Sequence, residues 1–211
     1  MHQIAPMSED QMAIKDAVEK TIAPFDDEYW GKTDETGNWP EEFCDAMAKG
    51  GWLGIAFPEE YGGAGLGLTE AALMMQTVTR SGAGYSGASA IHLNIFGPKP
   101  LEKFGTPEQK QENLPKIISG KEKMCFAVTE PNSGLDTSSL ETKAERTNNG
   151  YVINGRKIWT TGAQRADKIL IIARTTPKDQ CAKPHLGLSL FYTDLNRNRI
   201  EANPIPKMGR K

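Results

Sequence analysis

Long apolar runs and any marked excess of charge are absent from this sequence, and each absence excludes a class of protein. No apolar stretch in the 211 residues approaches the roughly 20 that a membrane-spanning helix requires. The 25 basic and 27 acidic residues give a net charge of −2, without a long run of either sign. Binding to nucleic acid or to an anionic membrane surface is therefore not expected.

Cysteine is also scarce. The three cysteines, Cys44, Cys125 and Cys181, lie far apart and form no CxxC or CxxH pair. An odd, scattered set is typical of reduced thiols, so we expect neither a disulfide framework nor a metal site. The N-terminus resembles neither a signal peptide nor a transit sequence, and we expect a cytoplasmic protein.

The first half of the chain carries helical signals. Ser8 and Gln11 form a capping-box pattern, and the apolar residues behind them recur every three or four positions, as in a helix. Residues 26–38 are polar and contain glycine, which predicts a loop. Thr106 opens another helix, and Pro115 is expected to kink or end it. The other expected helices cover residues 40–49, 69–81 and 86–96.

In the second half the apolar pattern changes to that of β-strands. Turn signals at residues 148–150 and 154–155 separate the first three expected strands and predict a β-meander. The expected strands cover residues 140–146, 151–153, 157–161, 168–174, 186–192 and 200–206. The sequence therefore predicts an α+β chain, with an N-terminal all-helical domain at residues 1–120 followed by an antiparallel β-domain at residues 121–211.

Two stretches of the β half stand out. Residues 124–136 form an apolar run that breaks at Thr129-Glu130-Pro131 into a polar turn with one glycine, and residues 157–162 carry a tryptophan followed by two threonines. These stretches and several other short motifs resemble landmarks of the acyl-CoA dehydrogenase family, in the expected order. The motifs are Gly51–Ile55, Pro58–Gly63, Phe104–Lys110, Leu114–Ile117, Val128–Pro131, Asn154–Trp159 and Lys207–Gly209. Their shared order over most of the chain makes the resemblance specific.

The resemblance implies a fold and an activity. Members of this family place an N-terminal helical domain before a β-domain that holds FAD, and a C-terminal four-helix domain completes the site. They dehydrogenate an acyl-CoA thioester at its α and β carbons and pass the electrons to electron-transfer flavoprotein. They are commonly homodimers or tetramers. The chain is therefore expected to be the helical and β portion of such an oligomeric flavoprotein oxidoreductase of fatty acid metabolism.

The resemblance assigns no catalytic base to this chain. In the family the base is a glutamate of the C-terminal helical domain, whereas this sequence ends at Lys211 within the expected β-domain. Glu130 lies in the turn motif itself and is expected to order that turn rather than to accept a proton. The chain alone is expected to hold FAD poorly and to be inactive.

Motif position also implies the flavin contacts. The residues carried over are Phe126, Val128, Thr129, Gly134, Leu135, Trp159, Thr160 and Thr161. Phe126 stands where the family often has tyrosine, so the aromatic wall is kept. Leu135 stands where it often has a serine that contacts both the flavin pyrophosphate and the acyl-CoA. The substitution leaves Leu135 with its backbone N–H alone for cofactor and substrate.

The chemistry of these residues suits a flavin. The pyrimidine edge of the ring presents an acceptor, a donor and an acceptor, and a strand end at Val128–Thr129 with a hydroxyl can match that pattern. Donors there would also stabilise the anionic ring that forms on reduction. Gly134 would let backbone N–H groups approach the pyrophosphate. Trp159 would pack along the ring while Thr161 donates toward N5.

Two other hypotheses stay open. The chain could be a non-catalytic binding or assembly subunit of the same fold, and a purified chain that is unchanged by FAD and acyl-CoA would favour this. It could also belong to an acyl-CoA oxidase-like flavoenzyme, which oxygen consumption would reveal. The sequence gives neither the acyl chain length nor whether the natural chain continues past Lys211.

Overall fold

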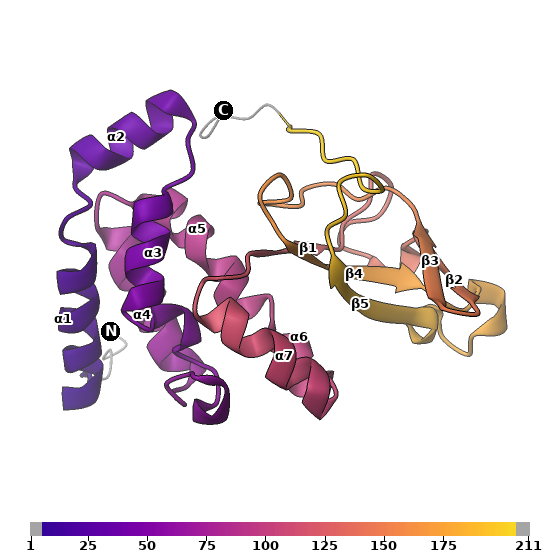
Figure 1. The fold of residues 1–211 in the computed structure, drawn as a ribbon, viewed down its shortest axis with the longest axis horizontal. Helices are drawn as coiled ribbons and strands as arrows, with labels where there is room; N and C mark the ends of the chain where they lie inside the picture. The colour runs from indigo at the N-terminus through magenta and orange to yellow at the C-terminus, as the bar shows by residue number, and fades with distance from the viewer. Residues whose placement is uncertain (1–5, 206–211) are drawn as a thin grey trace, which may run out of the picture. The chain divides into compact units, whose positions relative to one another are not determined.

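The computed structural model describes residues 6–205, which divide into two compact units (Figure 1). The first, which we call the helical unit, ends at Lys121, and the second, the β unit, spans Glu122–Ile205. Each has a hydrophobic core of its own. Within residues 6–205, no helix combines the length and the apolar character that crossing a membrane requires.

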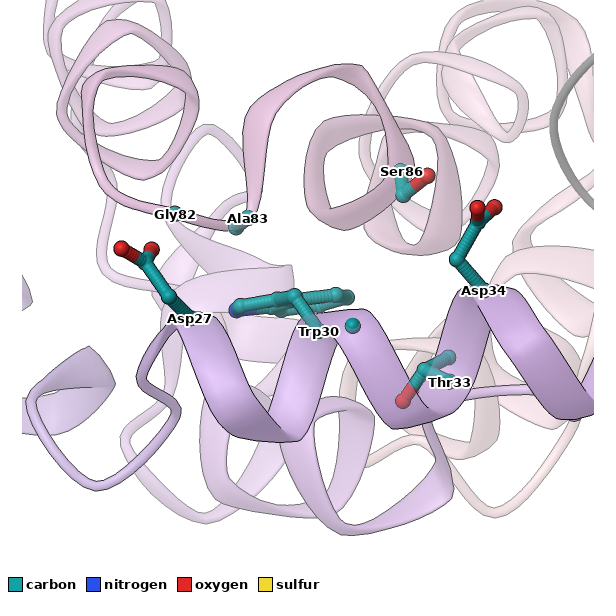
Figure 2. A pocket seen from close by; sticks show the side chains of 8 residues that line it. Asp27, Trp30, Thr33, Asp34, Gly82, Ala83 and Ser86 are labelled. Carbon is teal, nitrogen blue, oxygen red and sulfur yellow. The ribbon is translucent and has the colours of Figure 1, made fainter.

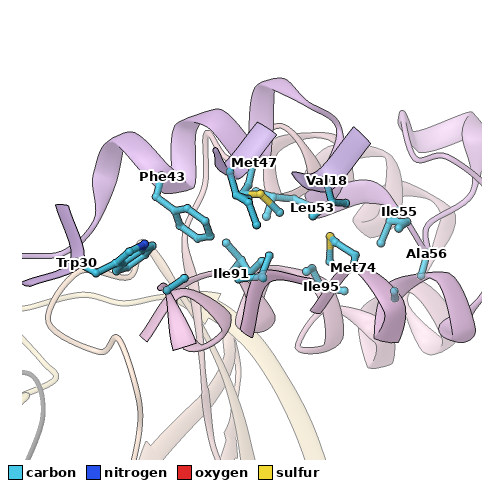
Figure 3. Packing of buried hydrophobic residues seen from close by; sticks show 14 residues of the cluster. Val18, Trp30, Phe43, Met47, Leu53, Ile55, Ala56, Met74, Ile91 and Ile95 are labelled. Atoms are coloured by element: carbon cyan, nitrogen blue, oxygen red, sulfur yellow. The ribbon is translucent and has the colours of Figure 1, made fainter. Parts of the chain in front are cut away.

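The described part of the helical unit contains α1 (Glu9–Ile22), α2 (Asp27–Thr36), α3 (Glu41–Lys49), α4 (Leu68–Arg80), α5 (Gly84–Phe96), α6 (Lys99–Phe104) and α7 (Pro107–Ile118). The apolar faces of α1 to α5 meet in one core (Figure 3), where Phe43 and Met47 of α3 lie opposite Ile91 of α5. Burying a large apolar side chain contributes about 1.5–3 kcal/mol, so this core is the main source of the unit's stability.

The expected helix starts are confirmed. The Ser8 hydroxyl accepts a hydrogen bond from the Gln11 N–H, and the Gln11 side chain accepts one from the Ser8 N–H, both at 3.2 Å. Thr106 and Gln109 form the same reciprocal pair. Pro115 was expected to kink or end this helix, and an end there is wrong, because α7 continues to Ile118. Ile117 and Ile118 of its last turn are buried, and their packing outweighs the hydrogen bond that a proline removes.

The loop predicted at residues 26–38 is also wrong, since α2 occupies most of it. Asp26 caps this helix by accepting a hydrogen bond from the Tyr29 N–H at 3.0 Å, and Gly37 ends it at φ 68°. Trp30 is buried, and its ring centroid lies 5.0 Å from that of Phe43 in an edge-to-face contact. The helix is therefore held by its caps and by the aromatic contacts of Trp30 and of Tyr29, which packs against Phe25. A further short helix, α6, was not predicted either.

The β unit is a five-stranded mixed sheet. Its strands are β1 (Met124–Ala127), β2 (Lys143–Thr147), β3 (Gly150–Asn154), β4 (Lys168–Arg174) and β5 (Leu188–Asp194). β4 pairs with β1 in parallel and with β5 in antiparallel orientation, and the β2–β3 hairpin joins β4 through one parallel pair, Lys143–Arg174. Most of β4 is buried, in agreement with its continuous apolar sequence.

The α+β class is confirmed, with helices first and strands second. The sheet is not antiparallel throughout, because β1 and β2 run parallel to β4. The hairpin at residues 148–150 and the strand at 168–174 are confirmed. No strand forms at residues 157–161 or 200–205, so the expected meander has two strands instead of three. The Lys207–Gly209 motif lies outside the described residues.

Candidate functional site

The two stretches singled out in the sequence lie side by side at the end of β1. The Ile158 N–H donates a hydrogen bond to the Thr129 carbonyl oxygen at 2.8 Å. The ammonium group of Lys157 donates to the Val128 carbonyl oxygen at 2.9 Å. Residues 157–158 are therefore attached to the two residues that follow β1, although the partners in each bond lie 29 positions apart in the sequence.

A tight turn follows β1. Glu130 and Ser133 exchange backbone hydrogen bonds at 2.9 and 3.1 Å, so Pro131 and Asn132 form the exposed tip. The Ser133 hydroxyl then donates to the Asp136 carbonyl oxygen at 2.6 Å. These bonds hold both ends of the turn and leave Gly134 and Leu135 at the surface.

The Glu130 carboxylate is buried beneath this turn, with only 6% of the residue exposed. It accepts hydrogen bonds from the N–H groups of Glu141 at 2.6 Å and Thr142 at 2.9 Å, and from the Lys157 ammonium group at 2.8 Å. Burial acts to raise the pKa of Glu130, but these hydrogen bonds outweigh it and lower the pKa to about 2. A carboxylate so stabilised does not accept a proton near neutral pH. The structure thus agrees with the ordering role expected for Glu130.

Three large apolar side chains lie at the surface around the two segments. Leu135 is fully exposed, and Trp159 and Phe126 are 63% and 38% exposed. Trp159 has φ 60°, the left-handed region that bulky residues rarely occupy. Its carbonyl oxygen accepts a hydrogen bond from the Thr161 N–H at 3.1 Å, which closes a turn with the indole outside.

Unused hydrogen-bond donors accompany these apolar surfaces. In the described part of the chain, the hydroxyl groups of Thr129, Thr160 and Thr161 have no protein partner. The same holds for the backbone N–H groups of Gly134 and Leu135. A flat ring with polar edges and an attached phosphate chain requires this mixture of apolar wall and free donors, so the residues present fit a flavin nucleotide.

The protein itself does not require glycine at position 134. A Cβ atom added there would meet only the Thr129 methyl group, at 3.9 Å, and the backbone is outside the left-handed region. The space that a side chain would fill is therefore open. Open space beside a free N–H group is what close approach of a phosphate needs.

Sequence reasoning found the two segments but missed the residue that joins them. Lys157 stood within an expected strand, and nothing in its neighbourhood indicated that its side chain reaches Val128 and Glu130. A lysine between an arginine and an isoleucine has no distinguishing pattern. Its role follows from the fold alone.

The helical unit has a separate pocket of about 280 Å³ (Figure 2). Trp30 lies along α2 between Asp27 and Asp34, and the segment from Gly82 to Ser86 faces them. None of the lining residues is an expected flavin contact. The two carboxylates would repel a pyrophosphate, so the lining of this pocket does not suit a flavin nucleotide. No cluster of three or more histidine, cysteine or acidic side chains able to hold a metal ion occurs among residues 6–205.

Comparison with known proteins gives the same two-part division. The family model for the N-terminal domain of acyl-CoA dehydrogenases matches residues 8–121, and the model for their middle domain matches residues 125–211. A Bacillus subtilis protein named probable acyl-CoA dehydrogenase YngJ is 37% identical over 198 residues, which are 93% of this chain and 50% of that protein. The chain spans about half the length of the curated relatives it matches.

Solved structures agree. An acyl-CoA dehydrogenase from Geobacillus kaustophilus has a TM-score of 0.78 and 27% identity over 89% of this chain and 48% of its own. A structure described as the FAD complex of PigA has a TM-score of 0.82 and 25% identity over 91% of this chain and 49% of its own. The order of the motifs, the two-part fold and both family models lead to one conclusion: the chain belongs to the acyl-CoA dehydrogenase family.

Proposed function

We propose that this chain is the flavin-holding portion of an FAD-dependent acyl-CoA dehydrogenase. The complete enzyme would convert an acyl-CoA thioester to the 2-enoyl-CoA and pass the electrons to electron-transfer flavoprotein. The observation that carries the proposal is the junction of the two segments, where the Ile158 N–H bonds to the Thr129 carbonyl beside exposed Trp159. Family membership and the FAD-bound structural relative support the choice of cofactor.

The chain's own residues divide the work of holding the cofactor. Val128 and Thr129 would present backbone groups and a hydroxyl to the pyrimidine edge, with the Thr129 hydroxyl free to donate. The N–H groups of Gly134 and Leu135 would bind the pyrophosphate. Phe126 and Trp159 would cover the ring and exclude water, since both expose aromatic surface. The hydroxyl groups of Thr160 and Thr161 would donate hydrogen bonds to the ring from the segment that carries Trp159.

Bound flavin supplies the two-electron acceptor that dehydrogenation of a thioester requires. Removing the α-proton needs a base, and Glu130 does not serve because its pKa is lowered to about 2 and its oxygens are bonded. We therefore assign the base to a residue outside this site, and expect turnover to require more protein than the two units described here. Leu135 adds no side-chain donor toward a substrate.

A titration of the purified chain with FAD tests the proposal. Flavin bound beside Trp159 is expected to quench the fluorescence of that tryptophan, with an affinity that is weak in the absence of further domains. Trp159→Phe should remove most of the quenching, whereas Trp39→Phe, which changes a tryptophan of the helical unit, should not. Quenching that survives Trp159→Phe unchanged, or a chain that binds no FAD, would contradict the proposed site.

A further inference from the structure

We propose that Glu130 and Lys157 form a positioning pair, which sets the geometry of Trp159 relative to the end of β1. This inference rests on the proposed function, because it names the device that would place the flavin-facing groups. The two side chains are 6% and 10% exposed, and their charged atoms lie 2.8 Å apart. Neither residue is itself an expected flavin contact.

The bonds of this pair reach both segments at once. Lys157 donates to Glu130 and to the Val128 carbonyl oxygen, which lies immediately before Thr129. Glu130 in turn accepts from the N–H groups of Glu141 and Thr142, which fixes it to the chain that leads into β2. One buried ion pair thus connects three separate stretches of backbone.

Three consecutive residues show what the pair achieves. Lys157 is anchored by its side chain and Ile158 by its N–H, and Trp159 follows directly with φ 60°. A bulky residue in the left-handed region is strained and persists only where its surroundings hold it there. The anchors at 157 and 158 supply that hold, and the strained residue is the one whose indole lies at the surface.

The pair also sets the polarity of the surface. The Val128 carbonyl oxygen accepts a hydrogen bond from the Lys157 ammonium group, and the Thr129 carbonyl oxygen accepts one from the Ile158 N–H. Both backbone acceptors at the end of β1 therefore already have a donor within the protein. The Thr129 hydroxyl remains free to donate. A surface that offers donors suits a ring whose charge becomes negative on reduction. Loss of Lys157 would leave the Val128 carbonyl oxygen without this donor, and a free acceptor beside the ring would disfavour its reduced, negatively charged form.

The burial of this ion pair does not by itself mean that the pair stabilises the folded protein. A desolvated ion pair often contributes little net free energy, yet removal of one partner leaves an uncompensated buried charge. The test therefore removes both charges together in E130Q/K157M. As a structural control, Tyr192→Phe breaks the hydrogen bond that the Tyr192 hydroxyl of β5 donates to Glu122 in the same unit.

E130Q/K157M is expected to remain folded and to bind FAD about tenfold more weakly, as expected when charge-assisted hydrogen bonds that order a site are lost. Its Trp159 emission, taken as the difference from the same protein carrying Trp159→Phe, should shift, and acrylamide should quench it differently. Tyr192→Phe should alter thermal stability but leave FAD affinity within about twofold.

A folded double variant with wild-type FAD affinity and unchanged Trp159 emission would overturn the inference. If the double variant does not fold, E130Q alone is compared, since it keeps the shape and one acceptor oxygen of the side chain. A folded E130Q with unchanged affinity and emission overturns the inference equally. Acrylamide quenching needs no flavin, so it tests positioning even where wild-type protein fails to bind FAD, an outcome that refutes the proposed function separately.

Discussion

Glu130 makes the stability of the β unit depend on pH. Its pKa is lowered from 4.5 to about 2, because the bonds from Lys157 and two backbone N–H groups outweigh the effect of burial. A group whose pKa is depressed on folding stabilises the protein fully above its unfolded pKa, and this stabilisation is lost as the pH falls toward its folded pKa. The contribution of Glu130 should therefore decline between pH 4.5 and 2.

We expect acidification from pH 7 to pH 2 to remove on the order of 3 kcal/mol of unfolding free energy through this residue. Urea denaturation of wild-type protein and of E130Q at several pH values measures it. E130Q should begin less stable and lose less on acidification, because glutamine does not titrate. Parallel pH profiles for the two proteins would show that Glu130 is not the group responsible.

Two glycines near the site should respond to substitution in opposite ways. At Gly134 an added Cβ meets nothing closer than 3.9 Å, whereas at Gly155 it would lie 2.3 Å from the Thr142 hydroxyl oxygen and 2.7 Å from the Thr142 Cα. The fold therefore requires glycine at position 155 and permits a side chain at position 134. A side chain at position 134 would therefore interfere only with a ligand that approaches the Gly134 N–H group.

Gly134→Val is expected to leave the melting temperature within a few degrees and to weaken FAD binding at least about tenfold, because the side chain would fill the phosphate approach. Gly155→Ala is expected to destabilise the β unit by about 1–3 kcal/mol through overpacking. Thermal melts and FAD titrations of both variants measure the contrast. Undiminished FAD affinity in Gly134→Val would remove Gly134 from the cofactor site.

At the scale of elements, those with local signals could be predicted. The capping pairs at Ser8 and Thr106 predicted two helix starts, and the apolar run at residues 169–173 predicted the strand at 168–174 that the structure shows as β4. The dipeptide signals at residues 148–150 fixed the β2–β3 hairpin. In each case the information lies within a few residues of sequence.

The second helix, α2, was not predicted because its stabilising contacts are made with residues outside the segment. Trp30 is the one residue of α2 that is buried, so the segment shows no apolar stripe. Its stabilisation comes from the contact of Trp30 with Phe43 and from the hydrogen bond of the indole to the Phe25 carbonyl oxygen. Asp26 and Gly37 are residue types typical of helix caps, but the polar composition between them is equally typical of a loop.

Residues 157–161 were expected to form a strand because they are rich in β-branched and aromatic side chains. Instead, the backbone of this segment joins β1 through the Ile158 N–H, and the left-handed conformation of Trp159 breaks any regular ladder. Composition could identify the segment as part of the candidate site. It could not reveal the contact with Thr129 or the reach of Lys157, because both depend on residues far away in the sequence.

At the scale of the whole molecule, two separate cores predict two thermal transitions. Met74 is fully buried in the core of the helical unit, and Ile169 is 5% exposed in that of the β unit. Truncating such a side chain to alanine costs about 2–5 kcal/mol. Met74→Ala and Ile169→Ala therefore serve to assign each transition to its unit in calorimetry.

Saturating FAD should raise the transition that Ile169→Ala lowers. The expected flavin contacts all lie in the β unit, and a ligand present at 100 times its dissociation constant adds about 2.7 kcal/mol to the state that binds it. For a unit of this size the shift corresponds to about 15 °C. The transition that Met74→Ala lowers should move less, since none of the expected contacts belongs to the helical unit. If FAD instead raised that transition alone, the cofactor would bind the helical unit and the assignment to the end of β1 would be wrong.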